Sequence, residues 1–454
     1  MLKRKIYADL VEWKNRAHRP LVISGQRQVG KTYIVREFAS KEYENLVELN
    51  FSENPDDCRI FDGPLKPETI LARISITHPG TRLDAGSTLI FLDEIQDCPR
   101  AYASLKFMSE SGFDIIASGS LLGIKMPNLS DDPDKINVLT PMGSEETVTM
   151  FALDFEEFLW AKGIREDMIE TIRGCISGCR PIDDVILDSI NAYYREYMIV
   201  GGMPASVSAF MDTGNFTGVR RVLTELNQSC LRDINRYNNG IDILKTTECY
   251  ESIPDQLSES NKKFMYSRIR GEGSRKAADR YSENILWIKG AGYGNFCYSA
   301  KDLSLPLKSN RKAFKIYQSD TGMLINRYGD NCLKAIYEGK SDYNKGAIVE
   351  NAVAEGLMKS GYVPRYYAVS KGKNHMEVDF VVETGDGICA IEVKSGKSRS
   401  APSIDKARTA YNIARTIKLE DSNISKDEDG VEHYPLFAAC FFRELEPEWD
   451  GPEL

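Results

Sequence analysis

The sequence predicts an α/β protein with a mostly parallel sheet, and two observations lead to that fold class. Between Leu21 and Phe151, short apolar runs alternate with helical stretches. The runs are almost continuously apolar, as in strands that helices cover on both faces. They lie at 21–24, 46–51, 88–92 and 113–117, after a lead-in helix within 1–20. At 454 residues the chain exceeds what one hydrophobic core usually organises, so we expect further domains beyond this first one at 1–151.

The composition is that of a globular protein in a reducing compartment. Hydrophobic residues make up 42% and charged residues 28%, which excludes wholesale disorder and a fibrous architecture. The longest apolar runs, such as 89–92, are too short to cross a bilayer, and the basic residues within 1–5 precede no apolar segment of a secretory signal. Ten cysteines without framework spacing suit a reducing cytoplasm. We therefore expect a cytoplasmic protein without membrane contact.

The formal charge of −9 hides a strong asymmetry along the chain. The segment 262–315 contains thirteen Lys and Arg against four Asp and Glu, so it is basic within an acidic protein. Such a segment is typical of a contact with a polyanion such as DNA. A solvated basic face without a partner explains the charge equally well.

A phosphate-loop motif directly follows the first apolar run. Residues 25–32 fit the pattern G-x-x-x-x-G-K-[ST]. Backbone N–H groups of such a loop wrap a phosphate, and the next helix adds its positive N-terminal end. Lys31 would neutralise the β and γ oxygens of ATP, and the Thr32 hydroxyl would reach Mg²⁺. The motif therefore predicts an ATP site formed by Gly25, Gln28, Val29, Gly30, Lys31 and Thr32.

Two later strand ends complete the predicted nucleotide site. The run 89–92 leads straight into Asp93 and Glu94, which places two carboxylates beside the phosphate loop. Asp93 would hold Mg²⁺ through water, and Glu94 would orient or deprotonate the attacking water. Ser118 ends the next run, where its hydroxyl would sense the γ-phosphate. The alternatives are a solvated acidic turn for the pair and an ordinary strand-end residue for Ser118.

The remaining chain predicts three further parts. A capping box at 154–157 opens a helical region that the turn signal 201–204 interrupts, and this predicts a helical lid over 152–240. A helix after Ser274, followed by a strand at 295–298, gives the element order of a winged-helix-like module over 241–335. The last unit, 340–454, predicts a helix over 347–359, strands at 377–382 and 390–394, a helix around 404–416 and a strand at 435–442.

A hairpin in this last unit gathers acidic residues. Pairing its strands across the turn at 384–387 would bring Asp379 beside Glu392, with Lys394 on the same face as Glu392. Two carboxylates at that spacing are hard oxygen ligands for Mg²⁺, and a neighbouring lysine can position or deprotonate a water. An ordinary hairpin with solvated Glu and Lys partners is the alternative.

These motifs together resemble a family, the prokaryotic AAA+ ATPases that carry a C-terminal domain of uncharacterised function. The resemblance spans nearly the whole chain and rests on the phosphate loop with 27–29 and on the runs 92–96, 118–120, 154–159, 201–204, 314–317 and 350–354. It implies a P-loop NTPase core, a helical lid, a winged-helix-like module and a C-terminal domain similar to PD-(D/E)XK, restriction-endonuclease-like folds.

The resemblance also assigns roles in the C-terminal domain. It makes Asp379, Glu392 and Lys394 a D…ExK set, and Glu350 matches the additional acid that binds the metal with Asp379 and Glu392. The chain departs from AAA+ rings in one respect, because no Arg occurs between Gly119 and Ile164 to act as an arginine finger. An oligomer is compatible with the resemblance, but ring-type activation in trans is in doubt.

Two functions account for these features. The first is an ATPase that couples ATP to a DNA-directed, Mg²⁺-dependent nuclease-like domain, with DNA bound through 262–315 and the C-terminal domain. The second is an ATP-dependent switch whose C-terminal domain binds protein or nucleic acid without cleaving it, since the same fold can bind without cutting. A metabolic kinase shares the phosphate loop but leaves the last hundred residues unexplained.

Overall fold

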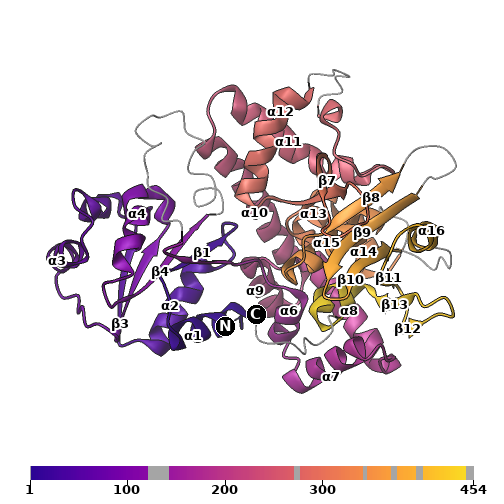
Figure 1. Ribbon diagram of the computed structural model, residues 1–454, viewed down its shortest axis with the longest axis horizontal. Helices are drawn as coiled ribbons and strands as arrows, with labels where there is room; N and C mark the ends of the chain where they lie inside the picture. The colour runs from indigo at the N-terminus through magenta and orange to yellow at the C-terminus, as the bar shows by residue number, and fades with distance from the viewer. Residues whose placement is uncertain are drawn as a thin grey trace. The chain divides into compact units, whose positions relative to one another are not determined.

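The computed structural model describes residues 2–120, 143–269, 277–340, 345–369, 376–394 and 402–445. The chain divides into two compact units (Figure 1). The N-terminal unit comprises 3–152 together with 290–292, and the C-terminal unit comprises 153–289 and 293–454. Among the described residues, no helix is both long enough and apolar enough to span a membrane.

The N-terminal unit is built on a parallel sheet, as the apolar runs predict. Its described strands form the order β2-β3-β4-β1-β5, and every neighbouring pair is parallel. The strands are β1 (Leu21–Gly25), β2 (Asn45–Asn50), β3 (Thr88–Asp93), β4 (Asp114–Ser120) and β5 (Glu146–Thr149). The helices are α1 (Ile6–Asn15), α2 (Lys31–Glu42), α3 (Pro67–Thr77) and α4 (Pro99–Met108), with 3₁₀ segments η1 (Pro55–Phe61) and η2 (Ile95–Asp97). The four predicted strands are confirmed, and β5 is a strand that the sequence pattern did not reveal.

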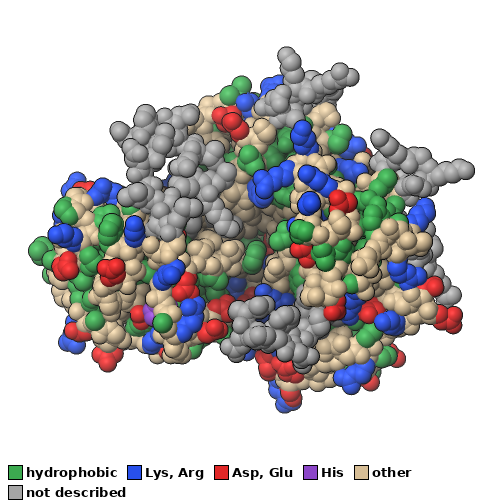
Figure 2. All heavy atoms as spheres, in the orientation of Figure 1, with side chains coloured by type: hydrophobic (Ala, Val, Ile, Leu, Met, Phe, Trp, Pro, Cys, Tyr) green, Lys and Arg blue, Asp and Glu red, His purple; other side chains and the backbone are tan. Residues whose placement is uncertain are grey.

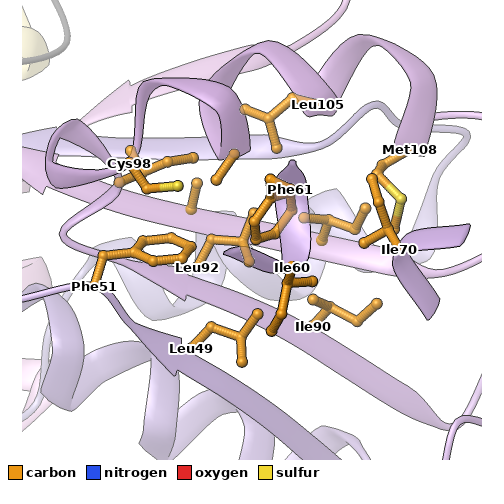
Figure 3. Packing of buried hydrophobic residues seen from close by; sticks show 14 of the residues in the cluster. Leu49, Phe51, Ile60, Phe61, Ile70, Ile90, Leu92, Cys98, Leu105 and Met108 are labelled. Atoms are coloured by element: carbon orange, nitrogen blue, oxygen red, sulfur yellow. The ribbon is translucent and has the colours of Figure 1, made fainter. Parts of the chain in front are cut away.

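The core of this unit lies between the sheet and its helices. Leu49 of β2 and Leu92 of β3 point toward Phe61 of η1 and Leu105 of α4 (Figure 3). All of these side chains are almost completely buried, and each such burial contributes about 1.5–3 kcal/mol relative to an exposed side chain. The packing fixes the strand ends at which the predicted nucleotide site lies.

The C-terminal unit begins with helices. They are α6 (Phe155–Ala161), α7 (Glu166–Ser177), α8 (Asp184–Val200), α9 (Pro204–Thr213), α10 (Phe216–Tyr237), α11 (Ile241–Ser258), the 3₁₀ segment η3 (Tyr266–Arg268) and α12 (Ala277–Ala291). The predicted capping box is confirmed, because Asp154 accepts from the Glu157 N–H at 2.8 Å and Glu157 accepts from the Asp154 N–H at 3.1 Å. The predicted turn at 201–204 separates α8 from α9. A Cβ at Gly202 would lie 2.0 Å from the Leu153 carbonyl oxygen, so this turn requires glycine.

The second half of this unit is a mixed sheet with helices. Its described strands have the order β12-β13-β11-β10-β9-β8-β6-β7. They are β6 (Gly294–Ala300), β7 (Ser309–Gln318), β8 (Arg365–Val369), β9 (Met376–Thr384), β10 (Gly387–Val393), β11 (Arg415–Glu420), β12 (Ser425–Lys426) and β13 (Glu432–Pro435). The helices are α13 (Thr321–Tyr328), α14 (Asp330–Tyr337), α15 (Lys345–Lys359), α16 (Pro402–Ala410) and the 3₁₀ segment η5 (Leu436–Leu445).

Three predictions for this half differ from the structure. The helix expected around 404–416 ends at Ala410, and 415–420 forms β11. The strand expected at 435–442 is η5, which packs on α15 and α7. A continuous apolar run buries equally well as strand or helix, so periodicity alone does not separate the two. Close packing on α15 decides the case, since a Cβ at Gly356 would meet the Ala439 backbone at 3.1 Å.

The third difference concerns the winged-helix-like module. The predicted order of helices followed by a strand pair is present, and β6 pairs antiparallel with β7. However, β6 also pairs with β8, so the strand pair is continuous with the sheet that carries the D…ExK hairpin. The β6–β7 pair is therefore not a separate wing, because β6 also hydrogen-bonds to β8 of the larger sheet.

Candidate functional site

The phosphate loop has the backbone shape that its glycines predict. It leaves β1 at Gly25 and enters α2 at Lys31, with Gln28 at φ 65° and Gly30 at φ 97°. Lys31 is 6% exposed, and its Nζ donates to the carbonyl oxygens of Gly25 and Gln26, at 3.1 Å each. Burial lowers the pKa of Lys31, while Glu94 and Asp93 act in the opposite direction. The ammonium is thus held inside the loop, where a phosphate would attract it.

Position 25 requires glycine because the backbone at Met150, just after β5, passes close to it. A Cβ at this position would lie 2.4 Å from the Met150 carbonyl oxygen. The Met150 N–H in turn donates to the Ser24 carbonyl at 2.7 Å, which holds the chain after β5 against the end of β1. Any larger side chain at Gly25 would separate these segments and deform the loop.

Asp93 is the centre of a polar network at the end of β3. Its Oδ2 accepts from Thr32 Oγ1 at 2.9 Å and from Asn50 Nδ2 at 3.0 Å, and its Oδ1 accepts from the Ser118 hydroxyl. Burial raises the pKa of Asp93, and the hydrogen bonds from Ser118 and Thr32 partly offset that rise. Three strand ends and the first turn of α2 therefore converge on one carboxylate, which is 1% exposed.

Glu94 follows Asp93 directly and has a left-handed backbone conformation. Its φ is 53°, so the chain turns sharply after β3 and enters η2. The Gln96 side chain donates its amide N–H to Glu94 Oε2 and accepts from the Ser120 N–H at 3.2 Å. Gln96 thus ties the orientation of the Glu94 carboxylate to the end of β4.

The structure brings together every residue that the sequence predicts for the nucleotide site, and it adds two. Asn50 and Gln96 were not predicted as site residues, although both lie in runs that had been noted, Asn50 at the end of an apolar run and Gln96 within 92–96. A polar residue at the carboxyl end of a strand next to the Asp93 strand is the signal that would have identified Asn50. The Thr32–Asp93 pair fits Mg²⁺, since hard oxygen ligands and retained waters are what this ion prefers.

The D…ExK hairpin forms a second group of charges, in which Glu392 is buried and Asp379 and Lys394 are partly buried. The Val393 N–H donates to Asp379 Oδ2 at 2.9 Å, which places Asp379 against β10. Burial raises the pKa of Asp379 to about 7, and repulsion from Glu350 and Glu392 adds to that rise. Lys394 Nζ pairs with Glu392 Oε1, whereas Glu392 Oε2 is buried without a hydrogen-bond partner. A buried carboxylate oxygen without a donor fits a cation ligand.

Glu350 has different partners from those predicted. It is 3% exposed, and it pairs with Lys315 at 2.9 Å, with Lys262, and with the Tyr317 hydroxyl. Within the described part of the chain, no three His, Cys, Asp or Glu side chains are arranged to hold a metal ion. Two lysines thus pair with Glu350, and its role as a metal ligand together with Asp379 and Glu392 stays a prediction.

The basic segment 262–315 is divided between the interior and the surface. Lys262 and Lys315 are bound to Glu350, and Arg268 lies 3.7 Å from Glu259. Arg275 and Lys276 lie outside the described residues. The exposed cations of the described part include four around the β6–β7 connection, Lys301, Lys308, Arg311 and Lys312. On the face shown in Figure 2, basic side chains gather where Figure 1 labels α11 and β7.

The fold and the loop geometry define a P-loop ATPase-like domain. The parallel sheet has the phosphate loop after β1 and the Asp93–Glu94 pair after β3. Accordingly, residues 17–159 match the family described as an AAA domain. Residues 191–331 and 345–436 match two domains of unknown function, DUF8612 and DUF4143.

One curated protein and two solved structures are similar to this chain over more than half of its length. The chain is 22% identical over 467 residues to the uncharacterized protein MJ1544 of Methanocaldococcus jannaschii, covering 98% of this chain and 91% of that protein. Among solved structures, the Walker-type ATPase PABY2304 of Pyrococcus abyssi aligns with a TM-score of 0.43 and 14% identity, over 72% of this chain and 96% of that one. AMPPCP-bound DnaA of Aquifex aeolicus aligns with a TM-score of 0.29 and 13% identity, over 63% and 86% of the two chains.

Proposed function

We propose that this chain binds ATP with Mg²⁺ and hydrolyses it. The observation that carries the proposal is the hydrogen-bonded set of Thr32, Asp93 and Ser118 beside the buried Lys31. A sheet that merely ended in solvated polar residues would not bury Lys31, Asp93 and Ser118 and direct two hydroxyl groups to one carboxylate.

Each residue has a role that follows from its chemistry. The backbone N–H groups of Gly25, Gln28, Val29 and Gly30 surround the phosphates, and Lys31 neutralises the β and γ oxygens. The Thr32 hydroxyl, and Asp93 through water, would hold Mg²⁺, which would supply positive charge at the transferred phosphoryl group. Glu94 orients the attacking water and accepts its proton, with Gln96 holding the carboxylate. Ser118, whose hydroxyl donates to Asp93 in this structure, would sense the γ-phosphate.

The test is nucleotide binding and phosphate release by purified protein. Lys31→Ala should abolish ATP binding, because it removes the buried ammonium that the loop carbonyls of Gly25 and Gln26 hold in place. Lys41→Ala is the matched control, since Lys41 is on the same helix but exposed and paired with Glu37. A Lys31→Ala protein that binds ATP like the Lys41→Ala protein would refute the assignment.

For the C-terminal unit we infer a metal-dependent site at Asp379, Glu392 and Lys394. The observation that favours it is the unpartnered, buried Glu392 Oε2 near a carboxyl whose pKa is raised to about 7. Two carboxylates suffice for Mg²⁺, which usually keeps several waters. Lys394 would act on a water, and Glu350 would orient lysines instead of binding the ion. The partner is DNA, and the alternative is binding of protein or nucleic acid without cleavage.

One assay separates these two activities. The full chain is incubated with linear and circular DNA, with Mg²⁺ or Mn²⁺, and with or without ATP. Cleavage that disappears in Asp379→Ala supports the nuclease, whereas DNA binding without cleavage supports the binding module. Neither cleavage nor binding under any of these conditions would remove DNA as the partner.

A further inference from the structure

Arg4 connects the lead-in segment to the phosphate loop. It precedes α1 and lies outside the segment 17–159 that matches the AAA domain. Its side chain is nevertheless buried, at 8% exposure, and Nη1 donates to the Val29 carbonyl at 2.9 Å. Nη2 donates to the Phe151 carbonyl at 2.6 Å. One guanidinium therefore joins the loop to the chain that follows β5.

The Val29 carbonyl is a loop acceptor that Arg4 satisfies from outside the loop. A loop that aims its N–H groups at a phosphate must turn its carbonyls outward, where each buried one needs a donor. Val29 lies between Gln28 and Gly30, which are both left-handed. The left-handed conformation of a residue such as Gln28 costs on the order of 1–3 kcal/mol unless its surroundings hold it. The bond from Arg4 is one such constraint.

The second bond fixes Arg4 itself. Phe151 directly follows Met150, the residue that pairs with Ser24 and closely approaches Gly25. The guanidinium thus spans from the outer side of the loop to the segment that supports its first glycine. The planar guanidinium presents its two terminal nitrogens in fixed directions, one toward each carbonyl. The lysine ammonium is instead a compact point charge on a flexible stem, so Arg4→Lys should hold the two carbonyls less rigidly.

We propose that Arg4 is a positioning residue of the nucleotide site, which holds the phosphate loop in its binding shape before ATP arrives. This inference rests on the proposed ATP binding for its effect on affinity, but not for its effect on the loop. An Arg4→Lys protein should bind ATP about tenfold more weakly, since part of the binding energy must then order the loop. Its kcat at saturating ATP should stay within about twofold of wild type, because Arg4 does not reach the Glu94 side of the site.

Arg73→Lys is the matched control. Arg73 also donates to two carbonyls of the same unit, Ile60 at 2.9 Å and Asp62, but neither belongs to the phosphate loop. If Arg4 has a merely structural role, both variants should lower Tm, and both should bind ATP with the same affinity. The proposal predicts weaker binding in Arg4→Lys only.

Hydrogen exchange of the nucleotide-free protein separates this inference from the proposed function. The amides of 26–30 should exchange at least tenfold faster in Arg4→Lys than in wild type, and at the wild-type rate in Arg73→Lys. If wild-type protein does not bind ATP but this difference appears, the ATP proposal fails and the positioning role stands. Equal exchange and equal affinity in Arg4→Lys would overturn the inference. If neither Arg4→Lys nor the milder Arg4→Gln folds while Arg73→Lys does, Arg4 is a structural residue and the inference is also overturned.

Discussion

Asp93 Oδ2 accepts a 2.9 Å hydrogen bond from Thr32 Oγ1, a residue 61 positions earlier in the chain. The bond joins the end of β3 to the first turn of α2, at the point where the phosphate loop becomes a helix. Because Asp93 also accepts from Ser118, this carboxylate positions two of the hydroxyl groups expected at the phosphates. The pair is the geometric basis for the first prediction.

Asp93→Asn should keep ATP binding but slow hydrolysis at least a hundredfold. The amide oxygen can still accept from Thr32, and the amide N–H₂ can donate to the Ser118 hydroxyl, so the fold is retained. The variant loses the charge that would hold the water shell of Mg²⁺. Phosphate release and nucleotide affinity are measured on the same preparation. The exposed Asp84→Asn is the control, and a wild-type rate in Asp93→Asn would contradict the assignment.

Glu94→Gln should bind ATP and lose turnover, because Gln remains polar but accepts no proton. Gln96→Ala should lower kcat about tenfold with KM unchanged, since it only releases the Glu94 carboxylate from its hydrogen bond. Steady-state kinetics give both parameters. Hydrolysis by Glu94→Gln at the wild-type rate would show that another group acts as the base.

Glu350→Gln should destabilise the C-terminal unit by about 3 kcal/mol, because it removes the charge of the closer carboxylate from the buried Lys315 ammonium and leaves the partly exposed Glu377 at 3.5 Å. Burial alone would raise the pKa of Glu350, but attraction to Lys315 and Lys262 outweighs burial and lowers it from 4.5 to about 2. A depressed carboxyl pKa gives stability that is present above pH 4.5 and is lost as the pH falls toward 2.

The measurement is denaturant unfolding of Glu350→Gln against wild type at pH 7 and pH 3. The difference should be large at pH 7 and smaller at pH 3. Asp56→Asn is the control, since the Asp56–Arg59 pair has side chains 87% and 80% exposed and such pairs contribute little. An unchanged stability of Glu350→Gln at pH 7 would mean that the lysines find other partners.

Mn²⁺ or Mg²⁺ should raise the Tm of the full chain at pH 8, and Asp379→Asn should remove that rise. The folded-state pKa of Asp379 is raised to about 7, mainly by burial, so without metal the protein loses stability as the pH increases from about 4 to 7. A cation relieves this penalty only where Asp379 is ionised, and the metal effect should vanish at pH 5. Lys394→Met should keep the metal effect and lose any cleavage.

The Tm measurement with metal requires the full chain, because a fragment starting at residue 340 would lack part of the sheet. Strand β8 is paired with β6, so a cut at 340 would expose a sheet edge in the middle of the unit. Identical melting with EDTA and with millimolar Mn²⁺ at pH 8 would count against the metal site and favour binding without cleavage.

Charge reversal in the β6–β7 connection should weaken DNA binding and flatten its salt dependence. Neutralised phosphates release counterions, so log K falls linearly with log[salt], and fewer contacts give a smaller slope. The variant changes the exposed residues Lys301, Lys308, Arg311 and Lys312. Reversal of four exposed cations of the N-terminal unit, Lys41, Lys66, Arg82 and Lys106, is the control.

The choice of these four residues follows from the structure. Reversal of Lys262, which the sequence alone favours equally, would place a carboxylate against buried Glu350 and test stability instead of DNA binding. If charge reversal at Lys301, Lys308, Arg311 and Lys312 leaves the slope of log K against log[salt] unchanged, the basic segment is a solvated face or a protein-docking surface.

The local features of this protein were determined by the sequence by itself. The sequence predicts β1 to β4 of the N-terminal unit, the phosphate loop, the Asp93–Glu94 pair and the capping box at Asp154, because each depends on neighbours within a few residues, whereas β5 was not predicted. Apolar runs bounded by turns set the strands, and the glycine spacing sets the loop. The meeting of Asp93 with Thr32 and Ser118 also follows, since parallel strands bring their carboxyl ends to one edge, but the contact with Asn50 was not predicted.

Only the tertiary structure decided which distant groups are paired. Glu350 has the residue type of a metal ligand, yet burial beside Lys315 and Lys262 makes it an ion-pair partner. The run at 436–445 is a 3₁₀ segment because α15 offers a close surface for its apolar side chains, and Arg4 meets Val29 across 25 residues. A buried charge costs so much unless it is compensated that its partner is selected by proximity in the folded chain, which spacing along the sequence does not encode.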